Sequence, residues 1–199
     1  MLQVKDRASI DSLPQMEILR DKGIDVLYFL DNVDEFAIEV MREYEGKPFH
    51  SISRGDLDLD DVESQEVKKK ETETIAKSNE DLIKDIKETL GDKVAEVKIS
   101  SRLKSSAVCL VADEQGPSFA MEQAFADANN PMFKARRILE INPKHDLFAR
   151  LQKVHEQGKE STAFKDYCSL LYAQALLIEG MMPEDPAAIA NKIAELMAR

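Results

Sequence analysis

The chain has few of the residues from which disulfide frameworks and membrane spans are built. Its only two cysteines, Cys109 and Cys168, lie far apart, each within an apolar run, so we expect buried free thiols in a reducing compartment. No hydrophobic stretch approaches the roughly 18 residues of a membrane helix. The N-terminus shows neither an apolar signal region nor a small-residue cleavage site. These absences predict a cytoplasmic protein that has no membrane partner.

The chain also has fewer basic than acidic residues. The chain has 27 Lys and Arg against 38 Asp and Glu, a net charge of -11 and a pI near 4.8. This balance argues against the phosphate backbone of nucleic acids as a partner. With 199 residues, 43% hydrophobic and 33% charged, the composition predicts one large or two small globular domains.

Motifs for catalysis and metal binding are absent or incomplete. The sequence contains no G-x-S-x-G, P-loop, G-x-G-x-x-G or H-E-x-x-H pattern. Asp56, Asp58 and Asp60 alternate as in a calcium-binding loop. However, Asp61 stands where that loop needs glycine, and Val67 stands where it needs a bidentate acid. The sequence therefore predicts no metal site.

Two further patterns are too short to indicate an enzyme. Ser101 and Lys104 have the S-x-x-K spacing of nucleophilic serine enzymes, but no K-T-G or S-D-N partner follows. The three histidines, His50, His145 and His155, share no ligand spacing, which predicts surface or capping roles. We predict no catalytic residue in this chain. The alternative, an enzyme, requires a pocket that joins one of these residues to an acid.

Apolar periodicity predicts an α+β fold. Helices are expected at 13–22 and 33–44, the latter capped by Asp31 or Asn32, and strands at 24–30 and within 49–52. This first unit has too few large apolar positions for a core of its own, so it is expected to be the tail of a larger domain.

A polar segment separates this unit from the rest of the chain. Residues 55–74 are expected to be a solvated linker, from which one long helix runs to Gly91. The second domain is then expected to contain a small mixed sheet covered by helices. Its strands are predicted at 94–99, 107–111 and 137–141, and its helices at 118–128, after Pro143 and in a C-terminal pair.

The C-terminal pair, residues 161–199, carries more apolar surface than two helices can hide between them. The first helix is apolar nearly all round, whereas the second, capped by Asp185 and opened by Pro186, has only a narrow stripe. Three or four uncovered large residues represent about 5 to 12 kcal/mol per chain, comparable to the roughly 4 to 15 kcal/mol cost of association. A second copy would cover this surface in a four-helix bundle. Alternatively, the rest of the chain covers the first helix.

The short helix after Gly116-Pro117 has two possible roles. Met121 and Phe125 lie on one apolar stripe, while Phe119 lies on another arc. Such a helix either lies in a core or presents a surface that accepts many partners.

Several segments resemble the C-terminal portion of the heat-shock protein 90 chaperones, of the bacterial high-temperature protein G type. They are EILRDKGIDVLYFLDNVDEF (17–36), EYEGKPFHSIS (43–53), VKISSRL (97–103), ILEINPKHDLFARL (138–151) and PEDPAAIANKIAELM (183–197). The similarity covers almost the whole chain in order, whereas residues 55–80 match in character only.

The resemblance implies a division into the end of the middle domain (1–62), a polar linker with the start of a connecting helix (63–80) and a C-terminal dimerisation domain (81–199). It implies homodimerisation through the last two helices and binding of non-native client proteins. The implied client-contact residues are Phe119, Met121 and Phe125, with Glu35 and Phe36 as their middle-domain counterparts. The implied dimer-interface residues are Tyr167, Leu170, Leu171, Leu177, Ile178, Ile189, Ile193, Leu196 and Met197.

The same resemblance implies that this fragment holds no cofactor, because the ATP-binding domain of the family lies upstream of these residues. The full-length parent is expected to use ATP and Mg. The chain ends without the tail of eukaryotic cytosolic members, which implies a bacterial source. The alternative function is a scaffold or dimerisation module that binds no client.

Overall fold

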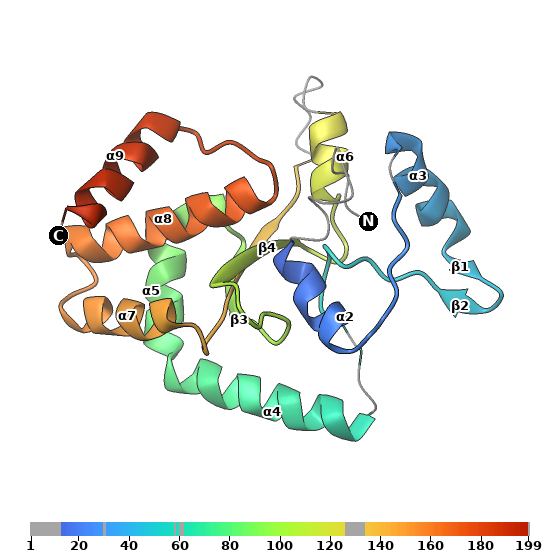
Figure 1. Cartoon of the computed structure of the whole chain (residues 1–199), viewed down its shortest axis with the longest axis horizontal. Coiled ribbons are helices and arrows are strands. Elements are labelled where there is room, and N and C mark those ends of the chain that lie inside the picture. Colours follow the sequence, from blue (N-terminus) through green and yellow to red (C-terminus); the bar gives the residue numbers. More distant parts are fainter. Residues whose placement is uncertain (1–12, 30, 58, 60–61, 126–133, 199) are drawn as a thin grey trace.

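The computed structural model describes residues 13–29, 31–57, 59, 62–125 and 134–198. Figure 1 shows an α+β arrangement, as predicted, with α3 and α9 at opposite ends of the molecule. The elements are η1 (Pro14–Met16), α2 (Glu17–Asp21), α3 (Asn32–Met41), β1 (Glu43–Tyr44), β2 (Lys47–Pro48), α4 (Val62–Ser78), α5 (Glu80–Leu90), η2 (Gly91–Lys93), β3 (Glu96–Ile99), β4 (Val108–Ala112), α6 (Phe119–Ala124), β5 (Arg137–Ile141), α7 (Asp146–Glu156), α8 (Thr162–Ile178) and α9 (Pro186–Met197).

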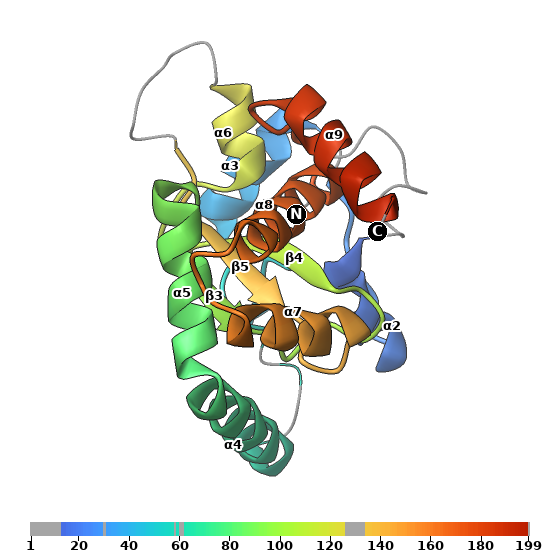
Figure 2. The ribbon, with the colours of Figure 1, turned by 90° about the vertical axis from the view of Figure 1, so that its left-hand side faces the viewer.

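A three-stranded mixed sheet forms the centre of the molecule. Its order is β3-β5-β4, with β5 parallel to β3 and antiparallel to β4. Alternate residues of β4 and β5 point to opposite faces, and both faces are buried. On one face, Leu110 and Leu139 pack in the main core with side chains of α5, α7 and α8. Figure 2 shows these three helices around the sheet and α4 extending away from it.

The structure contains the strands predicted at 107–111 and 137–141, as β4 and β5. It also contains the predicted helical pair at the C-terminus, as α8 and α9. The caps are also confirmed. Asp31 and Asp34 form a capping box at the start of α3, and Gly91 ends α5 at a φ of 57°. Pro186 opens α9 behind Asp185, whose side chain accepts a hydrogen bond from the Ala188 amide at 2.9 Å.

The strands predicted at 24–30 and within 49–52 are wrong for the described residues. Segments 24–29 and 49–52 are extended but belong to no ladder, and both line a groove of about 600 Å³. A strand needs a hydrogen-bonded neighbour, and local sequence cannot show whether one is present. A hairpin of two short strands, β1 and β2, precedes the second segment. Helix α3, which was expected to reach residue 44, ends at Met41 because Arg42 adopts a φ of 59°.

The expected single helix before Gly91 is in fact two. The polar segment is already helical from Val62, and the break falls at Asn79, between α4 and α5. Asn79 donates its side-chain amide to the Ile75 carbonyl at 2.8 Å and accepts a hydrogen bond from Gln152 of α7 at 2.6 Å. These bonds fix the bend at α7, which lets α5 lie along the sheet while α4 leaves it (Figure 1).

The N-terminal elements are joined to the sheet region through polar contacts that are exposed or partly buried. The Glu17 carboxylate accepts hydrogen bonds from the backbone amides of Lys104, Ser105 and Ser106 at 2.6 to 3.0 Å, and from both serine hydroxyls. Burial favours its protonated form, yet these hydrogen bonds, led by that from Ser106, leave the pKa of Glu17 below its ordinary value. α2 is thereby held to the loop before β4.

A second polar contact joins the N-terminal elements to the end of α8. Gln15 is fully buried and donates its side-chain amide to the Leu110 carbonyl at 2.9 Å and to the Glu179 carboxyl. Glu179 is the C-cap of α8. Burial raises its pKa from the ordinary 4.5 to about 7, while the Gln15 hydrogen bond acts in the opposite direction.

This raised pKa predicts a pH-dependent stability. The carboxyl of Glu179 binds a proton more tightly in the folded chain, so its contribution to folding is complete below pH 4.5 and is lost as the pH rises through about 7. We expect Glu179→Gln to remove this loss and raise the free energy of unfolding at pH 8 by on the order of 1–3 kcal/mol. Urea unfolding at pH 5 and pH 8 measures the effect. Glu156→Gln, at an exposed position of α7, is the control, and an equal gain there would contradict the assignment.

Candidate functional site

One side of α8 is covered by its own chain. Its buried side chains pack against β4, α5 and α7 in the main core: Phe164, Cys168, Leu171, Ala175 and Leu176. Leu171 is only 2% exposed, so its predicted place in a dimer interface is corrected. Sequence periodicity showed that α8 is apolar nearly all round but could not show that a sheet lies beneath it. The alternative, in which the chain itself covers the first helix, is right for this side.

The uncovered apolar surface lies instead on α9 and the outer side of α8. No residue of α9 is buried, although four large apolar residues follow one another at helical spacing: Ile189, Ile193, Leu196 and Met197. Ile193 is 44% exposed and Met197 is 83% exposed, and Leu177 of α8 is 51% exposed. We call these five residues the C-terminal apolar set. Figure 1 shows α9 as the outermost helix over α8.

The other predicted interface residues on α8 are partly buried. Tyr167 and Leu170 lie between the covered and the open sides, and the Tyr167 hydroxyl accepts a hydrogen bond from Arg150 at 3.2 Å. Ile178 packs against the small N-terminal cluster of Leu13, Met16, Ile18, Leu19 and Ile52. Lys192 of α9 forms an ion pair with Asp166 of α8. The two helices are thus joined while the apolar stripe of α9 stays open.

A second candidate surface forms where α3 meets α6. The rings of Phe36 and Phe125 make an edge-to-face contact with centroids 6.0 Å apart. These residues are far apart in sequence, and the fold brings them together from the two regions that were expected to contact clients. Phe36 is 39% exposed, and Met121 and Phe125 are partly buried.

Two residues expected on this surface are buried. Phe119 is 6% exposed and lies in the main core, with the Arg137 guanidinium 5.8 Å from its ring centre. Its helix is fixed in this orientation because Glu122 binds Arg137 at 2.9 Å. Glu35 is also 6% exposed and pairs with Arg54 at 2.8 Å. Both implied client-contact residues are therefore buried within the chain, and Phe119 adopts the core alternative that the sequence left open for its helix.

Sequence reasoning missed part of this surface. Val33 and Val40 of α3 are 66% and 84% exposed, and Met41 is also exposed. Their helical spacing with Phe36 is visible in the sequence, but such a stripe usually indicates a face packed in a core. Only the fold shows that no described part of the chain covers it. We call Val33, Phe36, Val40, Met121 and Phe125 the α3–α6 surface.

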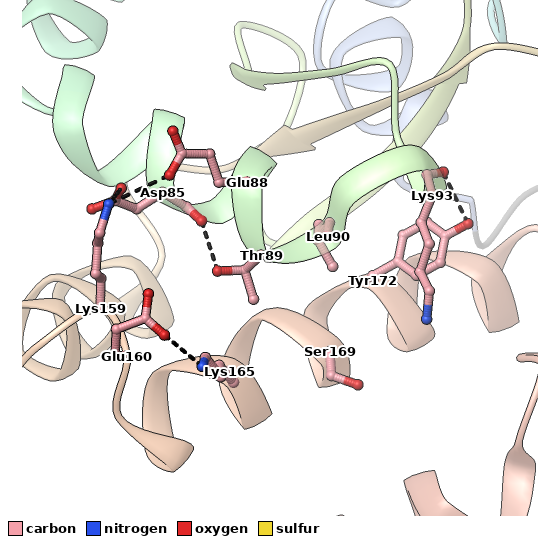
Figure 3. Close-up of a pocket in the computed structure, with 10 residues that line it drawn as sticks. All are labelled: Asp85, Glu88, Thr89, Leu90, Lys93, Lys159, Glu160, Lys165, Ser169 and Tyr172. Carbon is pink, nitrogen blue, oxygen red and sulfur yellow. Dashed lines mark hydrogen bonds and ion pairs between the residues drawn. The ribbon is translucent and has the colours of Figure 1, made fainter.

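A pocket of about 460 Å³ lies between α5 and α8 and is lined largely by charged residues (Figure 3). Lys159 donates to Asp85 at 2.8 Å and to Glu88 at 3.4 Å, and Lys165 donates to Glu160 at 2.6 Å. The hydrogen bonds from His155 and Lys159 lower the pKa of Asp85. The Lys159 pairs join α5 to the loop before α8, and the Lys165 pair joins this loop to α8, which indicates a structural role.

The cysteines and two of the histidines have structural surroundings. Cys109 and Cys168 are buried free thiols, as predicted. Burial raises the pKa of Cys168 to about 12 and that of Cys109 well above its ordinary value. The side chain of His145 caps α7, as expected, and that of His155 binds Asp85 at 2.7 Å.

Ser101 is exposed, and Lys104 pairs with Asp21 at 2.9 Å. Asp58 and Asp60 lie outside the described residues. Among the residues that are described, no three His, Cys, Asp or Glu side chains are grouped to hold a metal ion. No helix in that part of the chain is long and apolar enough to cross a membrane.

Comparison with known proteins identifies the family. The family model described as Hsp90 protein matches residues 2–199. The chain is 44% identical over 191 residues to Chaperone protein HtpG of Bacillus subtilis (strain 168), and 46% identical over 191 residues to that of Clostridium acetobutylicum; each match covers 94% of this chain. It is 39% identical to the HtpG of Geobacter sulfurreducens over 96% of this chain. The chain spans 29% of the length of these relatives. It belongs to the Hsp90 protein family.

Proposed function

We propose that this chain is part of an ATP-dependent molecular chaperone of bacterial cytoplasm, in which it joins two protomers and holds non-native client proteins. Membership of the Hsp90 family and the name of the relatives, chaperone protein HtpG, support this function. Because the chain spans 29% of those relatives, nucleotide and Mg are proposed to bind outside it. We retain the proposed division into 1–62, 63–80 and 81–199.

The dimer proposal is based on the open face of α9. Protein surfaces rarely leave a row of large apolar side chains uncovered unless they bind something. Three of the C-terminal apolar set, Leu177, Ile193 and Met197, are more than 40% exposed. Covering them contributes about 1.5–3 kcal/mol each per protomer. A second copy presents the same face, so α8 and α9 of both protomers would form a four-helix bundle.

The α3–α6 surface is the proposed client site. It combines an exposed aromatic ring, a flexible methionine and aliphatic side chains of α3, which suit the varied apolar segments of unfolded proteins. It also draws on both the N-terminal and the C-terminal elements of the chain. A client bound there would therefore contact both.

The client proposal is tested by the double variant Phe36→Ala/Phe125→Ala. We expect its affinity for a permanently unfolded model protein, measured by fluorescence anisotropy, to fall about 10- to 100-fold, since two aromatic contacts are lost. The melting temperature should change little, because Phe36 is 39% exposed and Phe125 is only partly buried.

Val67→Ala, at an exposed apolar position on α4, is the matched control and should bind as the unaltered chain does. Unchanged binding in the double variant, with the dimer intact, would favour a scaffold without a client role. A large fall in melting temperature would place the two rings in the core.

A further inference from the structure

We propose that Arg54 is a positioning residue that holds α3 against α6, so that Phe36, Met121 and Phe125 form one continuous binding surface. This inference rests on the proposed client function. It concerns a residue that no sequence pattern singled out, in the segment that links the N-terminal elements to the polar helix α4.

The backbone of Arg54 is attached to the central sheet. Residue 54 forms a single parallel bridge with Ala112, the last residue of β4. The Ala112 amide donates to the Ser53 carbonyl at 2.8 Å, and the Gly55 amide donates to the Ala112 carbonyl at 3.0 Å. Arg102 adds a second attachment by donating to the carbonyls of Ile52 and Gly55. The main chain at Arg54 is therefore attached to the central sheet, which forms its base.

The side chain of Arg54 reaches from this base to both helices of the binding surface. Its guanidinium donates to Glu35 at 2.8 Å and to Glu39 at 2.5 Å, two acids one turn apart on α3. The same guanidinium lies 3.7 Å from the sulfur of Met121 on α6. The Arg54 side chain is only 14% exposed, and that of Glu35 is 8% exposed. A pair so shielded from water is screened little by salt and constrains both partners.

The contact matters for binding because Glu35 precedes Phe36 in the same helix turn. When Arg54 holds Glu35, the Phe36 ring meets Phe125 edge-on. Without the guanidinium, α3 loses the ion pairs through which Glu35 and Glu39 are held to residue 54, and the Glu35 carboxylate is left buried and unpaired. The loss of the ion pairs alone lets α3 move relative to α6, and the unpaired charge favours this movement further. Phe36 would move with it, and the two halves of the α3–α6 surface would separate.

The first test measures the geometry directly. Spin labels at Val40→Cys and Gln123→Cys, both exposed positions on α3 and α6, report the distance between the helices, and the buried native thiols stay unlabelled. Labelled chains are diluted with unlabelled chains so that only distances within one protomer are read. We expect one narrow distribution for Arg54 and for Arg54→Lys, and a broadened one for Arg54→Met. A distribution that stays narrow in Arg54→Met would overturn the proposal.

The second test measures binding to a permanently unfolded model protein. Arg54→Met is expected to lose about 10-fold in affinity, and Arg54→Lys less than about 3-fold, because an ammonium still reaches Glu35. In the Phe36→Ala/Phe125→Ala background, Arg54→Met should cause almost no further loss, since it acts through those rings. Losses that simply multiply would overturn the proposal.

A third variant distinguishes the loss of positioning from a general loss of folding. Arg54→Met/Glu35→Gln removes the buried charge as well as the guanidinium, so it should fold while still lacking the ion pair. It is expected to show the broad distance distribution at a near-normal melting temperature, and a narrow distribution would contradict the positioning role. If the ring variants themselves bind the model protein normally, the client function fails, while the distance measurement still decides the role of Arg54.

Discussion

Ile193→Glu is expected to convert the proposed dimer of this chain into a folded monomer at micromolar concentration. Ile193 is 44% exposed in the middle of the open face of α9. In a two-fold symmetric interface the substitution occurs twice, so two apolar contacts are lost and two carboxylates are buried. The loss of about 3–6 kcal/mol corresponds to a roughly 100- to 20,000-fold weaker dimer. Analytical ultracentrifugation over a concentration series measures this change, and Leu177→Glu should have a similar effect.

Two comparisons separate the interface from the core. Val67→Glu, at an exposed apolar position on α4, should leave the mass in solution unchanged. Leu171→Glu should instead unfold the main core, because Leu171 is buried there within its own chain. An Ile193→Glu variant that remains dimeric at the same concentrations would refute the proposed α8–α9 bundle.

Arg102→Met is expected to destabilise the folded chain by about 3–5 kcal/mol, because it leaves a buried carboxylate without its partner. Arg102 and Glu140 of β5 are almost completely buried and pair at 3.0 Å, and Ser100 donates its hydroxyl to the same carboxylate at 2.6 Å. Arg102 also donates to the carbonyls of Ile52 and Gly55. The expected fall in melting temperature is about 6–20 °C. Differential scanning calorimetry is the direct measurement.

The double variant Arg102→Met/Glu140→Gln is the control for this prediction. It removes the unpaired charge and should recover more than half of the lost stability, although the two carbonyls still lack their donor. Lys98→Met, on the neighbouring strand β3, removes a more exposed positive charge and should change stability little. If Arg102→Met were no worse than Lys98→Met, the buried ion pair would not hold the segment 52–55 to the sheet.

The parts of the fold that were predicted correctly depend on local signals. Residues next to one another in sequence were enough to predict the caps of three helices and two strands. These are the N-caps Asp31 and Asp185, Gly91 at the end of α5, and the apolar strands 107–111 and 137–141. The errors concern partners far away in the chain. The segment 24–29 has the composition of a strand but lies in no described ladder. Likewise, the break at Asn79 depends on a hydrogen bond to α7.

The predictions of candidate site residues were likewise right for some residues and wrong for others. The resemblance placed Phe36, Met121 and Phe125 on a client surface, and the fold brings Phe36 and Phe125 into contact. It also implied a client contact for Phe119 and a dimer contact for Leu171, but both side chains are buried in the core of their own chain. Apolar periodicity states which side of a helix avoids water, yet it does not state whether that side meets the same chain or another.

The amino-acid sequence by itself determined the secondary structure of the C-terminal half, the family and the presence of too much apolar surface at the C-terminus, because these depend on local pattern and composition. Only the tertiary structure decided where that surface lies. The sheet covers the inner side of α8, α9 keeps its stripe exposed, and Arg54 meets α3 and α6 at one point. Burial is a property of contacts between distant residues, so no single segment encodes it.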